Sequence, residues 1–251
     1  MILISTLEQI GRFAGFALAA IPAMLFALRR PGELARQLYQ VLLGAIPLGV
    51  IAGMALGFVV WIHLRAVVDA AVREKIPEYV GLAIVLEFAP LGAGLIVAGR
   101  SGASLGAELG SMKLTEQIDA LQVLGLSPMT HLVGPRVLAS MIALPLLTVI
   151  TAYGAISSSW LAECLGGMLS FVQYQSAVWR GLDHMVLKVV LSTLKTIAFG
   201  YLIAVAGCWF GMNAKEGADG VGQAATRGVV ASIVLVLIAN VFLVKLIEMV
   251  A

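Results

Sequence analysis

The fold class is decided by apolar stretches such as residues 228–250, which read GVVASIVLVLIANVFLVKLIEMV. The two charged residues of this stretch, Lys245 and Glu248, lie near its end. A helix needs about 20 mostly apolar residues to cross the hydrocarbon core of a bilayer. Working outward along the chain, four further stretches meet this requirement, at residues 44–64, 81–104, 132–162 and 186–210. The pattern predicts an all-α polytopic membrane protein with about five transmembrane helices.

The composition of the chain points to the same class. Hydrophobic residues make up 61% of the 251 residues and charged residues 12%, and the mean hydropathy is +1.01. Soluble domains carry about 25% charged residues, so this chain has too little polar surface to cover a soluble globule. The net charge of +2 is small, and we expect no nucleic-acid partner. Cys164 and Cys208 form no CxxC pair, and we expect neither a metal site nor a bound cofactor.

Residues 1–43 differ from the predicted bundle at residues 44–251, and we expect both to belong to one domain. The uninterrupted apolar run from Phe13 to Leu28 has 16 residues and contains Pro22, so it is short for a membrane span. A basic corner, Arg29-Arg30, follows it. Such a pattern is typical of a helix that lies in the membrane interface. The alternative is a sixth span.

The Lys and Arg residues between the spans predict the orientation. Nine of them lie in residues 1–43, 100–136 and 211–227, and five lie in residues 65–80 and 163–188. Because basic loops tend to stay in the cytoplasm, the pattern predicts a cytoplasmic N-terminus.

The loop between the second and third spans is the most distinctive stretch. Residues 98–139 read AGRSGASLGAELGSMKLTEQIDALQVLGLSPMTHLVGPRVLA. The stretch begins with small residues, which let helices approach closely in lipid. A short amphipathic helix follows, for which we expect Thr115 as the N-cap and Gly125 as the stop signal. It suits docking into the groove of another protein, although an ordinary connector would have the same pattern.

Residues 98–139 closely resemble the MlaE/YrbE permeases, the membrane subunits of MCE-type phospholipid ABC transporters. PLLTVI at residues 145–150 and GADGVGQAATRGVV at residues 217–230 resemble the same family. The resemblance implies an N-terminal interfacial helix, five spans, and a homodimer that encloses a lipid pocket in a bacterial inner membrane. It also implies three kinds of partner: a cytosolic ABC ATPase that uses ATP, a periplasmic MCE-domain protein and, in some members, a STAS-domain protein.

The resemblance also assigns roles within the short loop helix. This helix would be the coupling helix seated on the ATPase, with its contacts carried by Glu116, Gln117, Ile118, Asp119 and Leu121. The chain itself has no GxxxxGK[ST] phosphate-binding loop, so we expect it to be a transport subunit and not an enzyme.

Glu87, in LEFAP at residues 86–90, is the candidate for a lipid-binding group. A carboxylate inside a membrane helix is costly unless it is paired or wetted, which makes it a functional candidate. The corresponding segment of the family resembles L-R-E-L-G-P, so Glu87 and Pro90 match and Leu86 stands where arginine is common. Lys195, in the fourth span, is expected to pair with Glu87 or to contact a lipid phosphate, and snorkelling is its alternative.

One face of the first span is the expected wall of the lipid pocket. Its residues follow i, i+4, i+7, i+8, i+11 spacing, which places them on one side of a helix. They are Leu56, Val60, His63, Leu64 and Val67. Ordinary helix packing would produce the same pattern.

Two other functions remain as alternatives. Residues 99–102 read GRSG, which fits the GxSG pattern of rhomboid-type intramembrane proteases and would make Ser101 a nucleophile that needs a histidine from another span. An ion-coupled secondary carrier would need ionisable groups near the bilayer midplane. The main prediction is therefore an ABC permease subunit for phospholipid, with no catalytic residues of its own.

Overall fold

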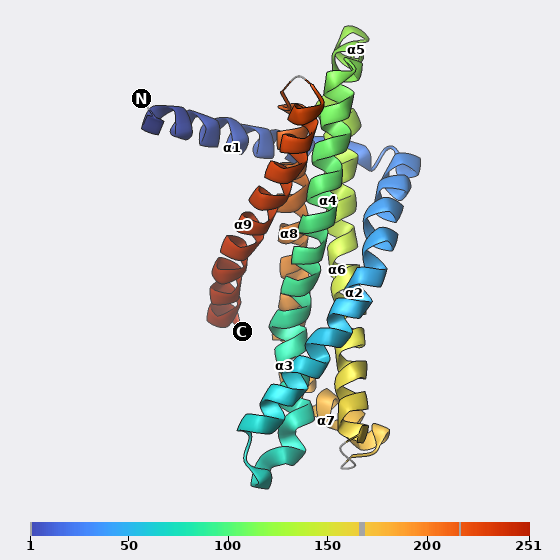
Figure 1. The fold of residues 1–251 in the computed structure, drawn as a ribbon, viewed down its shortest axis with the longest axis vertical. Helices are drawn as coiled ribbons and strands as arrows, with labels where there is room; N and C mark the ends of the chain where they lie inside the picture. Colours follow the sequence, from blue (N-terminus) through green and yellow to red (C-terminus); the bar gives the residue numbers. More distant parts are fainter. Residues whose placement is uncertain (1, 166–168, 216) are drawn as a thin grey trace. The chain divides into compact units, whose positions relative to one another are not determined.

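The computed structural model describes residues 2–165, 169–215 and 217–251 (Figure 1). The chain is 92% helical, and no strand occurs among these described residues. The segments are α1 (Ile2–Ala27), α2 (Pro31–Val67), η1 (Ala70–Lys75), α3 (Ile76–Ala83), η2 (Ile84–Phe88), α4 (Ala89–Leu114), α5 (Gln117–Val123), η3 (Met129–Val133), α6 (Gly134–Leu165), α7 (Phe171–Asp183), α8 (Val186–Met212) and α9 (Ala218–Val250). Here η1 is a 3-10 helix, whereas η2 and η3 are π-helical.

The predicted all-α membrane fold is confirmed. Within the described residues, six helical stretches are long and apolar enough to cross a membrane, at residues 7–27, 31–67, 73–114, 129–165, 186–212 and 218–250. The last five contain the five predicted spans. Helix α2 begins at Pro31, ahead of the predicted start of the first span at residue 44, and its first turns carry polar side chains. Residues 31–43 are therefore continuous with the first long helix.

The helices pack as two compact units. The first comprises residues 1–41, 97–143 and 198–236, and the second comprises residues 42–96, 144–197 and 237–251. We refer to them as unit 1 and unit 2. Helices α2, α4, α6, α8 and α9 contribute residues to both.

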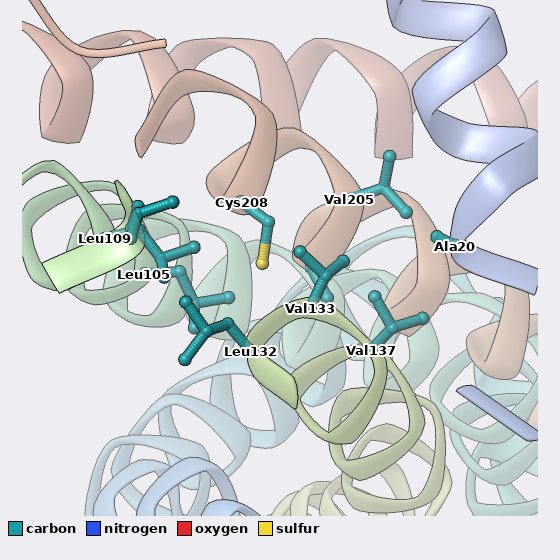
Figure 2. Packing of buried hydrophobic residues seen from close by; sticks show 10 residues of the cluster. Ala20, Leu105, Leu109, Leu132, Val133, Val137, Val205 and Cys208 are labelled. Carbon is teal, nitrogen blue, oxygen red and sulfur yellow. The ribbon is translucent and has the colours of Figure 1, made fainter. Parts of the chain in front are cut away.

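The core of unit 1 combines apolar side chains with close backbone contacts. Figure 2 shows the Cys208 thiol of α8 among Leu105 and Leu109 of α4 and Leu132 and Val133 of η3. Glycines of α4 then bring α4 and α9 together. A Cβ atom at Gly106 would lie 2.8 Å from the carbonyl oxygen of Ala224, so only glycine fits this approach. The small residues of the distinctive loop are thus part of the helix packing.

Within unit 1, helix α1 packs on α8 through aromatic side chains. The rings of Phe13 and Phe16 lie edge-on to Trp209 of α8, with centroid distances of 6.0 and 5.3 Å. The Tyr201 hydroxyl donates a hydrogen bond of 2.6 Å to the carbonyl of Ala17. In Figure 1, α1 runs crosswise to α8, which carries both of these partners. Since α8 is long enough to span a membrane, this crossing favours an interfacial α1 over a sixth span.

In unit 2, helix α2 approaches α6 through three glycines spaced four residues apart. Gly49 meets Leu147 and Thr151, Gly53 meets the backbone of Thr151, and Gly57 meets the backbone of Ala155. This GxxxGxxxG run lies on one helix face and is a known packing pattern in membranes. The spacing of Gly49, Gly53 and Gly57 is visible in the sequence and is a signal for this contact.

Replacing Gly53 with alanine should loosen the contact between α2 and α6. The new Cβ would overlap the carbonyl of Thr151, so we expect a loss of about 1–3 kcal/mol in unfolding free energy. Unfolding in detergent by circular dichroism measures this loss. Gly99→Ala is the matched control, because no atom lies within 4 Å of the added Cβ and the helix gains propensity. Equal stability of the two variants would contradict the packing described above.

Candidate functional site

The backbone around Glu87 departs from regular α-helix. Glu87 lies in the π-helical segment η2, between α3 and α4. Pro90 follows three residues later and has no N–H, so the carbonyl of Leu86 lacks the donor that an α-helix would supply four residues on. The Nζ of Lys195 on α8 donates to this carbonyl at 3.1 Å. Lys195 thus satisfies a backbone group that the proline leaves open, within unit 2.

The same ammonium group forms an ion pair with Glu87. The distance from Lys195 Nζ to Glu87 Oε1 is 2.9 Å, and the predicted pairing is therefore confirmed as a contact. The Lys195 side chain is only 1% exposed, whereas that of Glu87 is 40% exposed. Of the two groups, Glu87 is the one that a ligand can reach, and Lys195 acts from behind it.

A third polar side chain completes this cluster. Asn240 of α9 has its Nδ2 3.4 Å from Glu87 Oε2, a long hydrogen bond. Sequence analysis did not single out Asn240, although it is a lone amide in the apolar run VLIANVFLV. A polar residue inside such a run is itself a signal for a functional or packing role. Three helical elements of unit 2 therefore converge on one carboxylate.

Residues of the predicted pocket wall on α2 fall into a packed group and an exposed group. Val60 and Leu64 pack against the apolar cluster around Ile76 and Val80 of α3, so they are part of the core of unit 2. His63 and Val67 are exposed, and His63 Nδ1 lies 2.8 Å from the carbonyl of Val59, one turn back on its own helix.

Leu56 lies between these two groups. It is half-buried, and its Cδ1 would be 3.4 Å from a Cβ placed at Gly92 of α4. The spacing of the five residues places them on one helix face, but some are packed in the core of unit 2 and others are exposed.

A second carboxylate, which is buried, lies between the ends of α2 and α6. Glu163 is 5% exposed and accepts a hydrogen bond of 2.6 Å from Trp61 Nε1. The Arg65 guanidinium lies 3.8 Å from the same carboxylate and 4.9 Å from the centre of the Trp61 ring. This cluster of Trp61, Arg65 and Glu163 was not predicted. It ties the ends of two long helices through one oxygen of Glu163, Oε2.

The short loop helix is α5, and its start differs from our expectation. Thr115 is not the N-cap, since its hydroxyl donates to the carbonyl of Ser111 on α4. The N-cap is Glu116, whose φ of +56° places it in the left-handed region. The stop signal is confirmed: Gly125 has φ +73°, and Leu126 N donates to Leu121 O in a Schellman arrangement.

Side chains of α5 divide into a buried and an exposed set. Ile118 is 2% exposed and Leu121 is half-buried, and both pack on the core of unit 1. They hold α5 in place and present little surface to another protein. Glu116 and Gln117 are exposed, and so are Val123 and Leu124. The exposed apolar tip at Val123 and Leu124 was missing from the predicted set.

Asp119 has a partner within the chain. Lys113, at the end of α4, donates to both carboxylate oxygens of Asp119, at 2.8 and 3.1 Å. Both side chains are partly exposed, so the pair contributes little stability, typically about 0–1 kcal/mol. Its effect is to fix the direction in which α5 leaves α4.

The surroundings of Ser101 do not resemble a protease site. Ser101 is 5% exposed, and it stands one residue before Gly102, which closely approaches α9. His131, the histidine of the same unit, is engaged by Arg30 Nη2 at 2.7 Å. No hydrogen bond joins Ser101 to a histidine among the residues that the structure describes.

Comparisons with known proteins identify the family of the chain. A family model described as Permease MlaE matches residues 34–246, which include every candidate side chain above. The chain is 31% identical over 240 residues to a probable ABC transporter permease protein of Rickettsia typhi, covering 95% of this chain and 92% of that protein.

Relatives outside that genus match shorter parts. The chain is 35% identical over 181 residues to protein trigalactosyldiacylglycerol 1, chloroplastic, of Arabidopsis thaliana, covering 70% of this chain and 50% of that protein. It is 36% identical over 168 residues to a probable ABC transporter permease protein of Synechocystis, covering 64% and 61%.

Replacing Lys195 with methionine should destabilise the protein through two groups at once. It leaves the carbonyl of Leu86 without a donor, at a cost of about 1–3 kcal/mol, and it removes the partner of Glu87. The loss should be smaller in a Pro90→Ala background, because residue 90 then has an N–H that can serve Leu86. Chemical unfolding in detergent measures the loss of unfolding free energy in both backgrounds. Lys188→Met is the matched control on α8. An equal loss in both backgrounds would refute the link to Pro90.

Proposed function

Because the chain belongs to the MlaE permease family of ABC transporters, we propose that it moves phospholipid between a bacterial inner membrane and a periplasmic MCE-domain partner. A permease of this class works with a separate cytosolic ATPase, which supplies the energy. The observation that carries the lipid proposal is Glu87, a reachable carboxylate in an apolar stretch.

A phospholipid suits the surroundings of Glu87. Its acyl chains need apolar walls, and its head group needs polar or charged groups that are costly to place in a membrane without a purpose. Glu87, with Lys195 behind it and Asn240 beside it, offers such groups next to the apolar side chains of unit 2. We propose that the head group lies near Glu87 and that Leu56, His63 and Val67 face the acyl chains. The name of the Arabidopsis relative is that of a glycerolipid, which supports a lipid cargo.

The role of Lys195 follows from its burial. With 1% of its side chain exposed, it cannot reach a head group directly. We propose that it holds the Glu87 carboxylate in a fixed orientation through their ion pair of 2.9 Å. Lys195 is then a positioning residue and not a contact for lipid phosphate.

Coupling to the ATPase is assigned to α5. Exposed apolar residues at the end of a short helix suit insertion into a groove of a partner. Val123 is 89% exposed and Leu124 is 72% exposed, and Glu116 and Gln117 add polar contacts at the other end. We propose that this surface receives the movement of the ATPase and that Ile118 and Leu121 transmit it to the core of unit 1.

The remaining features of the assembly follow the family. We propose a homodimer of single-domain permeases with a cytoplasmic N-terminus, in which α1 lies in the membrane interface. A STAS-domain protein is a further partner in some members of the family, and it belongs to the same proposal.

Native mass spectrometry of the complex extracted gently from its own membrane tests this function. We expect two copies of this chain, two ATPase subunits and bound phospholipid. Glu87→Gln should lower the amount of bound phospholipid while the protein stoichiometry stays the same, because the carboxylate contacts the head group and not the ATPase. A complex without phospholipid, under conditions that keep lipids on other transporters, would overturn the lipid proposal.

Charge changes around α5 test the coupling surface. Asp119→Lys should lower the lipid moved per ATP hydrolysed, because it breaks the contact with Lys113 that directs α5. Adding Lys113→Asp should restore part of the coupling, since the swapped pair can form again. Glu116→Lys should also uncouple, but Lys113→Asp should not rescue it. The measurement is transport and hydrolysis in the same reconstituted vesicles, and rescue of both variants or of neither would contradict this assignment.

A further inference from the structure

Unit 2 contains a pocket that the proposed transport site does not use. Its volume is about 300 Å³, and it is lined by residues of η2, α6, α7 and α8. A volume of this size is at the lower end of the range for ligand pockets, about 300–1,000 Å³.

The pocket faces away from the Glu87 cluster. Val85 and Thr193 line it, and each stands two residues before a member of the ion pair, Glu87 and Lys195. Residues two apart in a helix point to different sides. The pocket and the ion pair therefore lie on different faces of η2 and α8.

The walls are mostly apolar and carry no charge. None of the lining residues is an Asp, Glu, Lys, Arg or His. The hydroxyl of Tyr174, at the buried side, is 2.7 Å from the hydroxyl of Ser159, and burial raises the pKa of Tyr174 to about 12. Tyr174 is therefore neutral at physiological pH. Water in such a pocket would gain few hydrogen bonds, so an apolar occupant is favoured.

The position of α7 points to a membrane occupant. This helix connects two stretches that are long enough to span the membrane, and a capping box of Ser170 and Gln173 fixes its start. Phe171, Tyr174, Val178 and Leu182 line the pocket from one face of α7, whereas Gln173, Ser176 and Arg180 are exposed. An amphipathic helix between two spans is typical of the membrane interface.

Aromatic side chains at the pocket agree with this position. Trp160 and Phe171 lie edge-on with a centroid distance of 4.8 Å, and Trp179 is 57% exposed although it lines an apolar wall. Tryptophan and tyrosine collect where acyl chains meet the head-group layer.

We propose that this pocket of α6, α7 and α8 binds one acyl chain of a membrane phospholipid, at a site separate from the Glu87 cluster. The pocket is too small for a partner's transmembrane helix, which is about 10–12 Å across with its side chains. The polar groups of Ser157 and Gln175 line the pocket as well and suit the ester region of the same lipid. The proposal rests on the membrane location of the chain and not on phospholipid as its cargo.

Photocross-linking in the intact complex tests this site. The probe is phosphatidylethanolamine with a diazirine in the middle of one acyl chain, supplied in vesicles of phosphatidylethanolamine and phosphatidylglycerol. We expect labelled peptides from α6 and α7. Val149→Trp fills the pocket and should lower this labelling about tenfold, which corresponds to a loss of about 1.4 kcal/mol in binding.

The matched control is Val190→Trp. Val190 on α8 is 48% exposed, close to the 43% of Val149, and it does not line the pocket. Labelling of α6 and α7 should be unchanged in this variant. Ser157→Trp fills the pocket from a second position and serves if Val149→Trp does not assemble. Labelling no stronger than that on the exposed residues of α9, or equal labelling in the filled and control variants, would overturn the proposal. Transport of the same probe, measured in parallel, reports separately on the proposed function.

Discussion

The structure depends on one constraint: in lipid, every backbone polar group has to find its partner within the protein. Long helices satisfy this constraint over most of the chain. The exceptions are positions where a backbone group has no partner within its own helix. Pro90 creates such a place by removing an N–H below the carbonyl of Leu86. Lys195 supplies the missing donor and at the same time balances Glu87. One side chain, Lys195, therefore both satisfies the backbone carbonyl of Leu86 and pairs with the candidate binding group Glu87.

Close packing supplies the second condition. Helices in a membrane gain little from the hydrophobic effect, so they associate through contact between smooth surfaces. Gly53 against α6 in unit 2 and Gly106 against α9 in unit 1 bring backbones to distances that no larger residue permits. Such close contacts make the helix pairs rigid. A rigid pair of helices can transmit a displacement of α5 to the rest of unit 1.

The two candidate sites differ in how they meet a partner. The Glu87 cluster is a buried arrangement with one accessible carboxylate, which suits a lipid head group. Helix α5, in contrast, buries Ile118 and Leu121 in the core of unit 1 and exposes the apolar side chains of Val123 and Leu124. Such an exposed apolar surface suits contact with another protein. An energy-driven permease needs both kinds of site, one for the cargo and one for the subunit that hydrolyses ATP.

The sequence by itself determined the place of five of the six long apolar helices found in the described residues, because length and hydropathy are local properties. It also determined the stop of α5 at Gly125 and the candidate status of Glu87, since a glycine after a helix and a carboxylate in an apolar run are visible without neighbours. Tertiary structure decided which side chains meet. Asn240 beside Glu87, Glu163 with Trp61, and Lys113 with Asp119 rather than a partner all depend on how separate segments pack. Spacing along one helix cannot reveal these contacts, because it does not say which helix lies opposite.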